Sequence, residues 1–266
     1  MKTVAIYCVN YQTYPELRSF LQSVNQASNE AFAVIRVDVF CADNTETEYQ
    51  EITFSSEHIR LKVFPFHQNK GYFGAVHDMM TQTSPNQYDF VIISNVDVTL
   101  MNDTLVQLAS LDVDAQTGWI APQIYSLQEQ RDLNPQVMHR YSKLRLKTLK
   151  LMYKYPFLHR LYVRLFYKMR HSSTHQAGEV YAGHGSFIIL TREYFKRCGI
   201  IDYPVFLYGE ELYLAELCRR HSLKVQYTPQ VKLEDKEHCS TGGMRKHLYY
   251  QCNYEAIYYI LSTFYV

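Results

Sequence analysis

Two adjacent carboxylates, Glu210 and Glu211, follow an aromatic loop that ends in Gly209. The apolar spacing behind them predicts a helix that starts at this pair and ends at the basic residues 219–221. The helix dipole favours acidic residues at a helix start and basic residues at its end, and this accounts for one glutamate. Two glutamates directly after an aromatic loop, late in the chain, are typical of a catalytic base on the wall of a cleft.

Short apolar segments predict the strands that would position this pair. In the first half they cover residues 4–9, 34–40, 59–63 and 90–93, and in the second half 119–122, 186–190 and 223–227. Helical spacing over residues 17–24 joins the first two strands, and a second helix is expected from about Gly71. Apolar strands that alternate with helices predict an α/β fold, with a mostly parallel sheet covered by helices on both faces.

Polar residues follow three successive strands of this predicted sheet. They are Asp43 and Asn44, then Asn69, Lys70 and Gly71, then Asn95 and Asp97. Each group alone is typical of an ordinary turn. Because ligands of such sheets bind beyond the carboxyl ends of the strands, three groups on one edge favour a site for a polar ligand.

The order of these motifs resembles an inverting family 2 glycosyltransferase of the GT-A fold, especially its rhamnosyltransferase-like bacterial branch. The resemblance is carried by Asn10-Tyr11-Gln12, Cys41-Ala42-Asp43-Asn44-Thr45, residues 69–75, Asn95-Val96-Asp97, residues 199–211, His238 and Asn253. Several positions depart from the family pattern, among them His77, where an asparagine is common. Asn95 replaces the first acid of the Asp-x-Asp metal motif, Glu211 replaces an aspartate, and Tyr213 replaces a later aspartate.

The resemblance implies a role for each matching residue. The donor, a UDP- or dTDP-sugar, would be bound by Asn10, Tyr11, Asp43, Asn44, Asn69, Lys70, Gly71, Asn95 and Asp97. A Mn²⁺ or Mg²⁺ ion would be held by Asp97 and His238 and would neutralise the diphosphate. Glu211 would be the catalytic base, and Glu210 would raise the proton affinity of the pair or orient the acceptor.

The charge of the chain is unevenly distributed although the net charge is only +1. Ten Lys or Arg residues lie from Arg140 to Arg170, and no acidic residue lies between Leu133 and Gly178. The rest of the chain carries 17 basic against 26 acidic residues. We interpret residues 1–266 as a single domain, with a basic amphipathic insertion at about 133–178 and a Tyr-rich C-terminal helix at about 244–266.

The insertion combines an apolar helical face with a basic stripe. The apolar face contains Leu158, Leu161, Tyr162, Leu165 and Met169, and the stripe contains Arg160, Arg164 and Lys168. This pattern favours an anionic membrane surface as the partner of residues about 140–170. A solvated helix packed on the domain and a nucleic-acid surface are the alternatives, although no RNA- or DNA-binding motif accompanies the patch, so no nucleic-acid partner is expected.

Targeting and redox signals point to the cytoplasm. Met1 and Lys2 lead directly into a strand pattern, and no apolar run reaches the roughly 20 residues that a spanning helix needs. The six Cys residues form no CxxC pair, so neither a disulfide framework nor a zinc site is indicated. We expect a cytoplasmic protein, peripheral at the inner face of the plasma membrane.

Together these observations predict a metal-dependent inverting hexosyl- or rhamnosyltransferase. Its acceptor would be a glycan hydroxyl, with the glycan linked to a polyprenyl diphosphate, in the synthesis of a bacterial capsule or lipopolysaccharide. A nucleotidyltransferase is one alternative, but it should carry a Gly-rich phosphate loop after the first strand, and residues 10–15 contain no Gly. A non-catalytic membrane or nucleic-acid binding protein on the same fold is the other.

Overall fold

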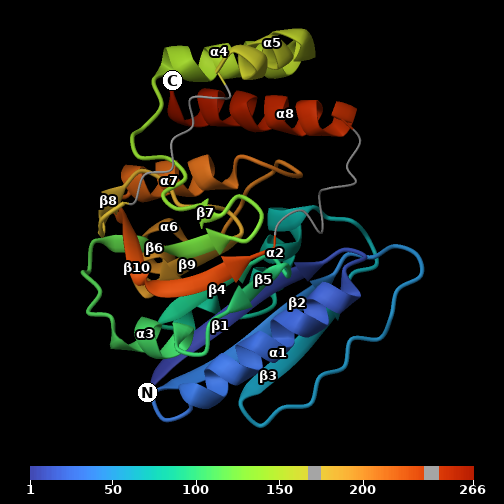
Figure 1. The fold of residues 1–266 in the computed structure, drawn as a ribbon, viewed down its shortest axis with the longest axis vertical. Coiled ribbons are helices and arrows are strands. Elements are labelled where there is room, and N and C mark those ends of the chain that lie inside the picture. Colours follow the sequence, from blue (N-terminus) through green and yellow to red (C-terminus); the bar gives the residue numbers. More distant parts are fainter. Residues whose placement is uncertain (167–174, 237–245) are drawn as a thin grey trace.

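The computed structural model describes residues 1–166, 175–236 and 246–266, without the side chains of residues 162, 163, 165 and 166 (Figure 1). The strands are β1 (Lys2–Asn10), β2 (Ile35–Asp43), β3 (Ile59–Pro65), β4 (Phe90–Ser94), β5 (Val98–Leu100), β6 (Thr117–Ser126), β7 (Arg131–Asp132), β8 (Gly178–Val180), β9 (Phe187–Thr191) and β10 (Lys224–Asp235). The α-helices are α1 (Tyr14–Glu30), α2 (Tyr72–Thr81), α3 (Thr104–Ser110), α4 (Lys143–Lys154), α5 (Pro156–Phe166), α6 (Arg192–Cys198), α7 (Glu210–Arg220) and α8 (Lys246–Phe264), and a 3₁₀ turn covers Pro85–Gln87.

The strands form one open sheet in the order β3-β2-β1-β4-β9-β6-β10-β5. The predicted α/β architecture is confirmed. The first four strands pair in parallel, as expected, and β6 is parallel to β10. The second half also introduces antiparallel pairs, because β9 runs against both of its neighbours, β4 and β6. The sheet is therefore mixed, with its parallel part at the N-terminal end of the chain.

Helices cover both faces of this sheet, and the alternation of side chains along β1 shows how. Val4, Ile6 and Cys8 pack in one apolar cluster with residues of α1 and α3. Ala5 and Tyr7 point to the other face and pack in a second cluster with residues of α2, α6, α7 and α8. Because successive strand residues point to opposite faces, a strand buried on both sides must be apolar throughout.

The basic insertion is divided between the body and an outer layer. Its first residues belong to the body, since Leu133, Asn134 and Val137 are buried. The outer layer begins with α4, where the Ser142 hydroxyl accepts a hydrogen bond from Arg145 N at 3.2 Å and caps the helix. Helices α4 and α5 lie over α8 at the end of the molecule far from the N-terminus (Figure 1). Within the described ranges, no helix combines the length and apolar character needed to cross a bilayer.

Candidate active site

The aromatic loop in front of α7 is folded so tightly that only glycine fits at its end. Gly209 has a φ of +81°, and a Cβ there would lie 2.6 Å from Tyr203 Oη and 2.8 Å from Ala256 Cβ. The Tyr203 hydroxyl donates a hydrogen bond to Tyr208 O at 2.8 Å. This packing fixes where α7 begins, and therefore where the carboxylates of its first turn lie.

Both glutamates of that first turn face Gly185, the residue two positions before β9. A Cβ on Gly185 would lie 2.8 Å from Glu211 Oε1 and 3.1 Å from Glu210 Oε1. Burial and the charge of Glu211 raise the pKa of Glu210 well above its ordinary value. Glu210 therefore holds its proton more tightly than an exposed glutamate does, and the pair can divide the roles of proton donor and proton acceptor.

The Asn95–Asp97 turn lies beside the same glycine. Asn95 N donates a hydrogen bond to Ser186 O at 2.8 Å, and Lys236 N donates to Asp97 O at 3.0 Å. The Asp97 side chain is buried, and Asn95 is partly exposed. Since Ser186 directly follows Gly185, the turn that carries Asp97 and the helix start that carries the glutamates contact adjacent residues of the chain.

Tyr72, at the start of α2, contacts the same glycine. Its hydroxyl donates a hydrogen bond to Gly185 O at 3.3 Å. Burial raises the pKa of Tyr72 well above its ordinary value, and the negative charges of Glu210, Asp97 and, more weakly, Glu211 raise it further. The Tyr72 hydroxyl therefore keeps its proton and can act as a hydrogen-bond donor.

The nucleotide-side residues form a network at the ends of β1 and β2. Asp43 is the last residue of β2 and not, as predicted, a residue after the strand. The strand extends three residues beyond the apolar pattern. Its Oδ1 accepts hydrogen bonds from Asn10 Nδ2 at 2.9 Å and Thr45 N at 3.1 Å, and its Oδ2 accepts one from Tyr14 Oη at 2.9 Å. Both carboxylate oxygens are thus already engaged within the protein.

Asn44 connects this network to the turn before α2. Its Nδ2 donates a hydrogen bond to Gly71 O at 3.0 Å, and its buried Oδ1 has no hydrogen-bond partner among the described residues. Gly71 has a φ of +72°, and a Cβ there would lie 2.1 Å from Phe206 O. The Asn69 side chain accepts from Gly71 N at 3.2 Å and closes the turn. These contacts join the strand ends to the loop that precedes the glutamates.

The other predicted ligand residues are arranged differently. The Lys70 ammonium pairs with Asp78 at 2.8 Å, so it is directed at α2 rather than at the strand ends. Tyr11 follows β1 and is partly exposed. His238 lies outside the described residues. Among those described, no group of three His, Cys, Asp or Glu side chains is placed to hold a metal ion.

Comparison with solved structures identifies the fold. A structure of GalNAc-T7 with UDP, GalNAc and Mn²⁺ matches 98% of this chain and 48% of its own, with a TM-score of 0.65 and 11% identity. S. aureus TarS matches over 89% of this chain and 60% of its own, with a TM-score of 0.53 and 9% identity. The present chain therefore spans about half of the first protein and three fifths of the second. No protein-family model and no curated protein sequence matches.

The chain has the GT-A fold of glycosyltransferases. Within this GT-A fold, the side-chain oxygens of Asp97 and Asn95 are the kind of ligand that a hard cation prefers. Mg²⁺ in particular is held by one or two carboxylates, with substrate phosphates as further ligands, so a protein-only cage is not needed. Asp97 would supply a carboxylate to such an ion, and Asn95 would supply an amide oxygen from the same turn.

Two parts of the site were not among the site residues predicted from the sequence. One is Tyr72; the other is the loop Gly183-His184-Gly185-Ser186. A Cβ on Gly183 would lie 2.8 Å from Ala121 Cβ, and His184 N donates to Asn134 Oδ1 at 2.7 Å. The His184 and Ser186 side chains are hydrogen-bonded at 2.9 Å. The available signal was a pair of glycines that flank a histidine directly before a strand.

An aromatic array extends from the glutamates toward the outer helices of the GT-A domain. It consists of Tyr208, Tyr249, Tyr250, Tyr153 and His159, each partly exposed. Ring centroids are 5.4 Å apart for Tyr208–Tyr249, 6.2 Å for Tyr153–Tyr249 and 5.4 Å for Tyr153–His159. Because Tyr208 lies two residues before Glu210, the array begins at the carboxylate pair.

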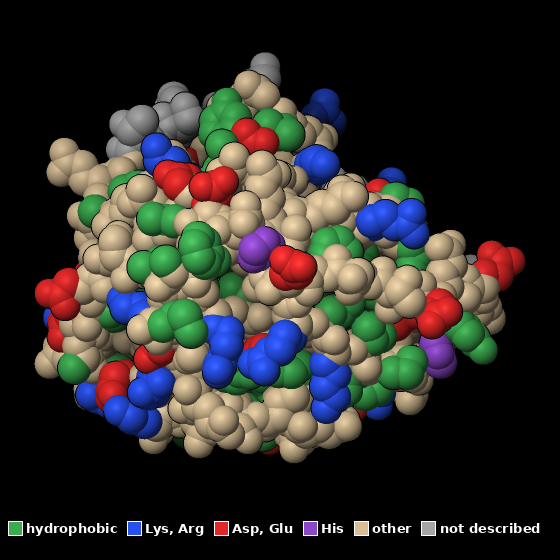
Figure 2. Space-filling model, turned by 90° about the horizontal axis from the view of Figure 1, so that it is seen from below, with side chains coloured by type: hydrophobic (Ala, Val, Ile, Leu, Met, Phe, Trp, Pro, Cys, Tyr) green, Lys and Arg blue, Asp and Glu red, His purple; other side chains and the backbone are tan. Residues whose placement is uncertain are grey.

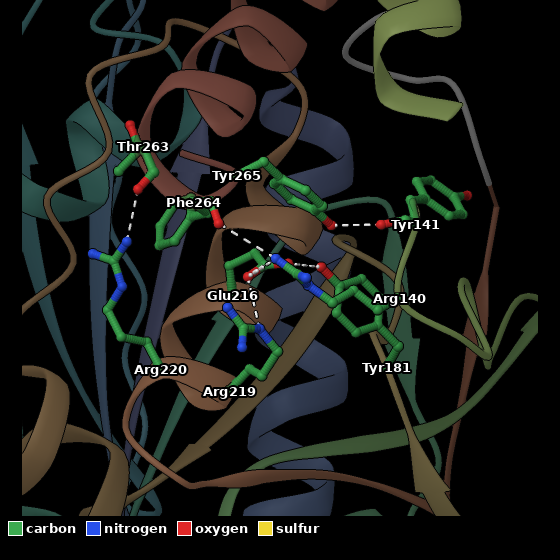
Figure 3. A network of polar contacts seen from close by, with 9 residues as sticks. All are labelled: Arg140, Tyr141, Tyr181, Glu216, Arg219, Arg220, Thr263, Phe264 and Tyr265. Carbon is green, nitrogen blue, oxygen red and sulfur yellow. Dashed lines mark hydrogen bonds and ion pairs between the residues drawn. The ribbon is translucent and has the colours of Figure 1, made fainter. Parts of the chain in front are cut away.

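The helix that carries the glutamates is held nearer its other end by a charge network around one buried glutamate (Figure 3). Glu216 is fully buried and accepts two hydrogen bonds from Arg140, at 2.7 and 3.1 Å. Tyr181 Oη and Arg219 Nε donate to the same carboxylate at 2.6 and 2.9 Å. Burial alone would raise the pKa of Glu216, but the hydrogen bonds from these three donors lower it. The network fixes α7 against the body and against the end of α8, where Arg140 also donates to Phe264 O at 3.4 Å.

Proposed function

We propose that this chain is a metal-dependent inverting glycosyltransferase, as in the rhamnosyltransferase-like branch of family 2. The donor is a UDP- or dTDP-sugar, and the acceptor is a hydroxyl of a glycan on a polyprenyl diphosphate. The observation that carries the proposal is the shared border at Gly185–Ser186, which Glu211 contacts from one side and Asn95 from the other. Such a reaction needs a base and a diphosphate site within the length of one sugar.

Glu211 is the base in this proposal. It takes the proton from the acceptor hydroxyl as that oxygen attacks the anomeric carbon, on the face opposite the departing diphosphate, and one such displacement inverts the anomeric centre. General-base assistance of this kind contributes about 10²- to 10⁴-fold. Glu210, whose pKa is raised, remains protonated more readily and donates a hydrogen bond that orients the acceptor.

The donor would lie along the ends of β1, β2 and β4. The Oδ1 of Asn44, which has no hydrogen-bond partner among the described residues, would accept from the ring N–H of uracil or thymine, and Tyr11 would supply a face for the base. Asp43 holds Asn10 and the Thr45 backbone in place for this contact. Asn69 and Gly71 shape the adjoining turn, and Lys70 reaches the phosphates once it leaves Asp78.

The metal would be held by Asp97, with Asn95 beside it and His238 as a second protein ligand. When bound, Mn²⁺ or Mg²⁺ neutralises charge on the diphosphate leaving group. The acceptor glycan would lie on the aromatic array, since tyrosine rings offer apolar faces together with polar hydroxyl groups.

A ligand panel tests the proposal directly. Melting midpoints of the purified chain are measured with nucleotides and nucleotide sugars, with and without Mn²⁺, because a ligand that binds only the folded state raises its apparent stability. We expect a metal-dependent increase for one UDP- or dTDP-sugar, together with its slow hydrolysis. Increases for nucleoside triphosphates alone, or for no nucleotide at all, would contradict the proposal.

A further inference from the structure

Helices α4 and α5 each have one face turned toward α8. Leu146 of α4 is fully buried, and the Tyr153 ring lies 6.2 Å from that of Tyr249 on α8. On α5, His159 Nδ1 lies 3.2 Å from Tyr250 Oη. Because the residues that face α8 recur with helical spacing, the residues between them form an outward face on both helices.

That outward face carries large apolar side chains. Leu144 and Leu151 of α4 are 74% and 49% exposed, and Phe157 and Leu161 of α5 are 62% and 54% exposed. Tyr155 joins the two sets, since its ring centroid lies 6.3 Å from that of Phe157. Leu144 and Leu151 are seven residues, or two helical turns, apart, and Tyr155 follows four residues later, so the three lie on one stripe and are not isolated apolar residues.

The same two helices carry unneutralised positive charge. Their exposed cations are Lys143, Arg145, Lys147, Lys154, Arg160 and Arg164. Of the basic residues 140–164, Arg140 alone forms an ion pair with a carboxylate in the part of the chain that the structure describes. The opposite end of the molecule differs, because basic and acidic side chains are interspersed there (Figure 2).

We propose that this outer face of α4 and α5 docks on an anionic lipid bilayer. Leu144, Leu151, Phe157 and Leu161 would enter the headgroup layer, and the flanking cations would contact lipid phosphates. A nucleic acid would match the charge but would leave the aliphatic side chains without an apolar partner. A second copy of the chain would cover them but would place two sets of cations against each other.

Docking in this orientation explains the position of the aromatic array. The array connects Tyr208, next to Glu210, with Tyr153 and His159 in the docking layer. A glycan carried on a membrane lipid would then extend along the tyrosines toward the glutamates. This route rests on the proposed function, whereas the docking itself does not.

Cosedimentation with vesicles tests the docking without any need for activity. Vesicles of phosphatidylglycerol and phosphatidylethanolamine are compared with vesicles of phosphatidylcholine. We expect binding to the anionic vesicles only, and weaker binding as salt increases. Two double variants, F157S/L161S and K147E/K154E, should each lower the partition coefficient by at least about tenfold. The first removes two apolar side chains that would enter the headgroup layer. The second removes two cations, each of which strengthens binding to an anionic surface several-fold.

Phe32 provides the matched control. It is 68% exposed, like Phe157, but it lies in the turn that pairs with the N-terminus through the Lys2 N to Val34 O hydrogen bond of 2.8 Å. Phe32→Ser should leave vesicle binding unchanged. Circular dichroism melts check that all variants are folded, which is expected because the substituted side chains are exposed.

Three results would overturn the proposal. The first is no sedimentation with anionic vesicles at low salt, or equal sedimentation of both double variants and the parent chain. The second is K147E/K154E losing affinity for a single-stranded oligonucleotide while vesicle binding is unchanged, which would assign the face to nucleic acid. The third is a concentration-dependent dimer that F157S/L161S abolishes, in a chain that does not bind vesicles.

Discussion

Gly185 and Glu211 are in direct contact across the candidate site, and the space between them is too small for a methyl group. A Cβ on Gly185 would lie 2.8 Å from Glu211 Oε1. The start of β9 therefore sets the position of the proposed base, although the two residues are far apart in sequence.

The first prediction follows from that contact. Gly185→Ala should displace the glutamate side chains and lower the transfer rate by about 10²-fold, the loss typical of a misplacement near 1 Å. Gly178→Ala is the matched control, because no atom of the described residues lies within 4 Å of its Cβ position. Transfer rates and melting midpoints of both variants are compared. Equal rates for the two variants would show that the close contact does not matter.

The second prediction concerns the base itself. Glu211→Gln keeps the shape of the side chain but cannot take a proton, so transfer should fall by about 10²- to 10⁴-fold. The donor should still raise the melting midpoint of this variant, because donor binding does not use the base. A fully active Glu211→Gln enzyme would exclude this role.

The third prediction is a pH dependence of stability. The pKa of Glu210 in the folded chain is raised well above 4.5, so the folded state binds this proton more tightly than the unfolded state. Between the two pKa values, raising the pH therefore lowers the free energy of unfolding. Glu210→Gln removes this titrating group. The melting midpoint of the variant, relative to that of the parent chain, should therefore increase as the pH rises above 4.5.

An exposed glutamate of the same chain, Glu51, provides the control substitution. Glu51→Gln makes the same substitution at an exposed side chain and controls for the loss of one surface charge. Parallel curves for Glu210→Gln and the parent would mean that the Glu210 carboxyl has an ordinary pKa.

The fourth prediction concerns the buried network under α7. Arg140→Ala leaves the fully buried Glu216 with Arg219 as its remaining cation. We expect a loss of about 2–3 kcal/mol in the free energy of unfolding, less than a broken buried pair usually costs because one partner persists. Lys196→Ala removes an exposed pair with Glu193 and should cost less than about 1 kcal/mol. Denaturant titration measures both, and similar losses would argue against a special role for the buried pair.

The fifth prediction separates acceptor binding from donor chemistry. Tyr249→Ala interrupts the aromatic array between Tyr208 and Tyr153. The KM for the acceptor should increase by about two- to tenfold, since an aromatic contact contributes about 0.5–1.5 kcal/mol. Hydrolysis of the donor should be unchanged. Tyr258→Ala, which removes a 54% exposed ring from α8, should change neither quantity.

Local sequence patterns determined most of the secondary structure of this protein. The apolar runs located β1 to β4, and the acidic pair located the first turn of α7, because burial and helix-end electrostatics act over a few residues. The strand ends were less well defined. Asp43 belongs to β2 because its carboxylate is satisfied by Asn10, Thr45 and Tyr14, and hydropathy alone does not report such partners.

The same patterns placed Asn44, Gly71 and Asp97 on one edge of the sheet, since parallel neighbouring strands end together. Only the tertiary structure decided what stands opposite them. The antiparallel entry of β9 brings Gly185 between Tyr72 and Glu211, and an apolar run does not specify the direction or partner of its strand. Contacts between residues more than a hundred positions apart depend on how helices and strands pack, which local spacing does not encode.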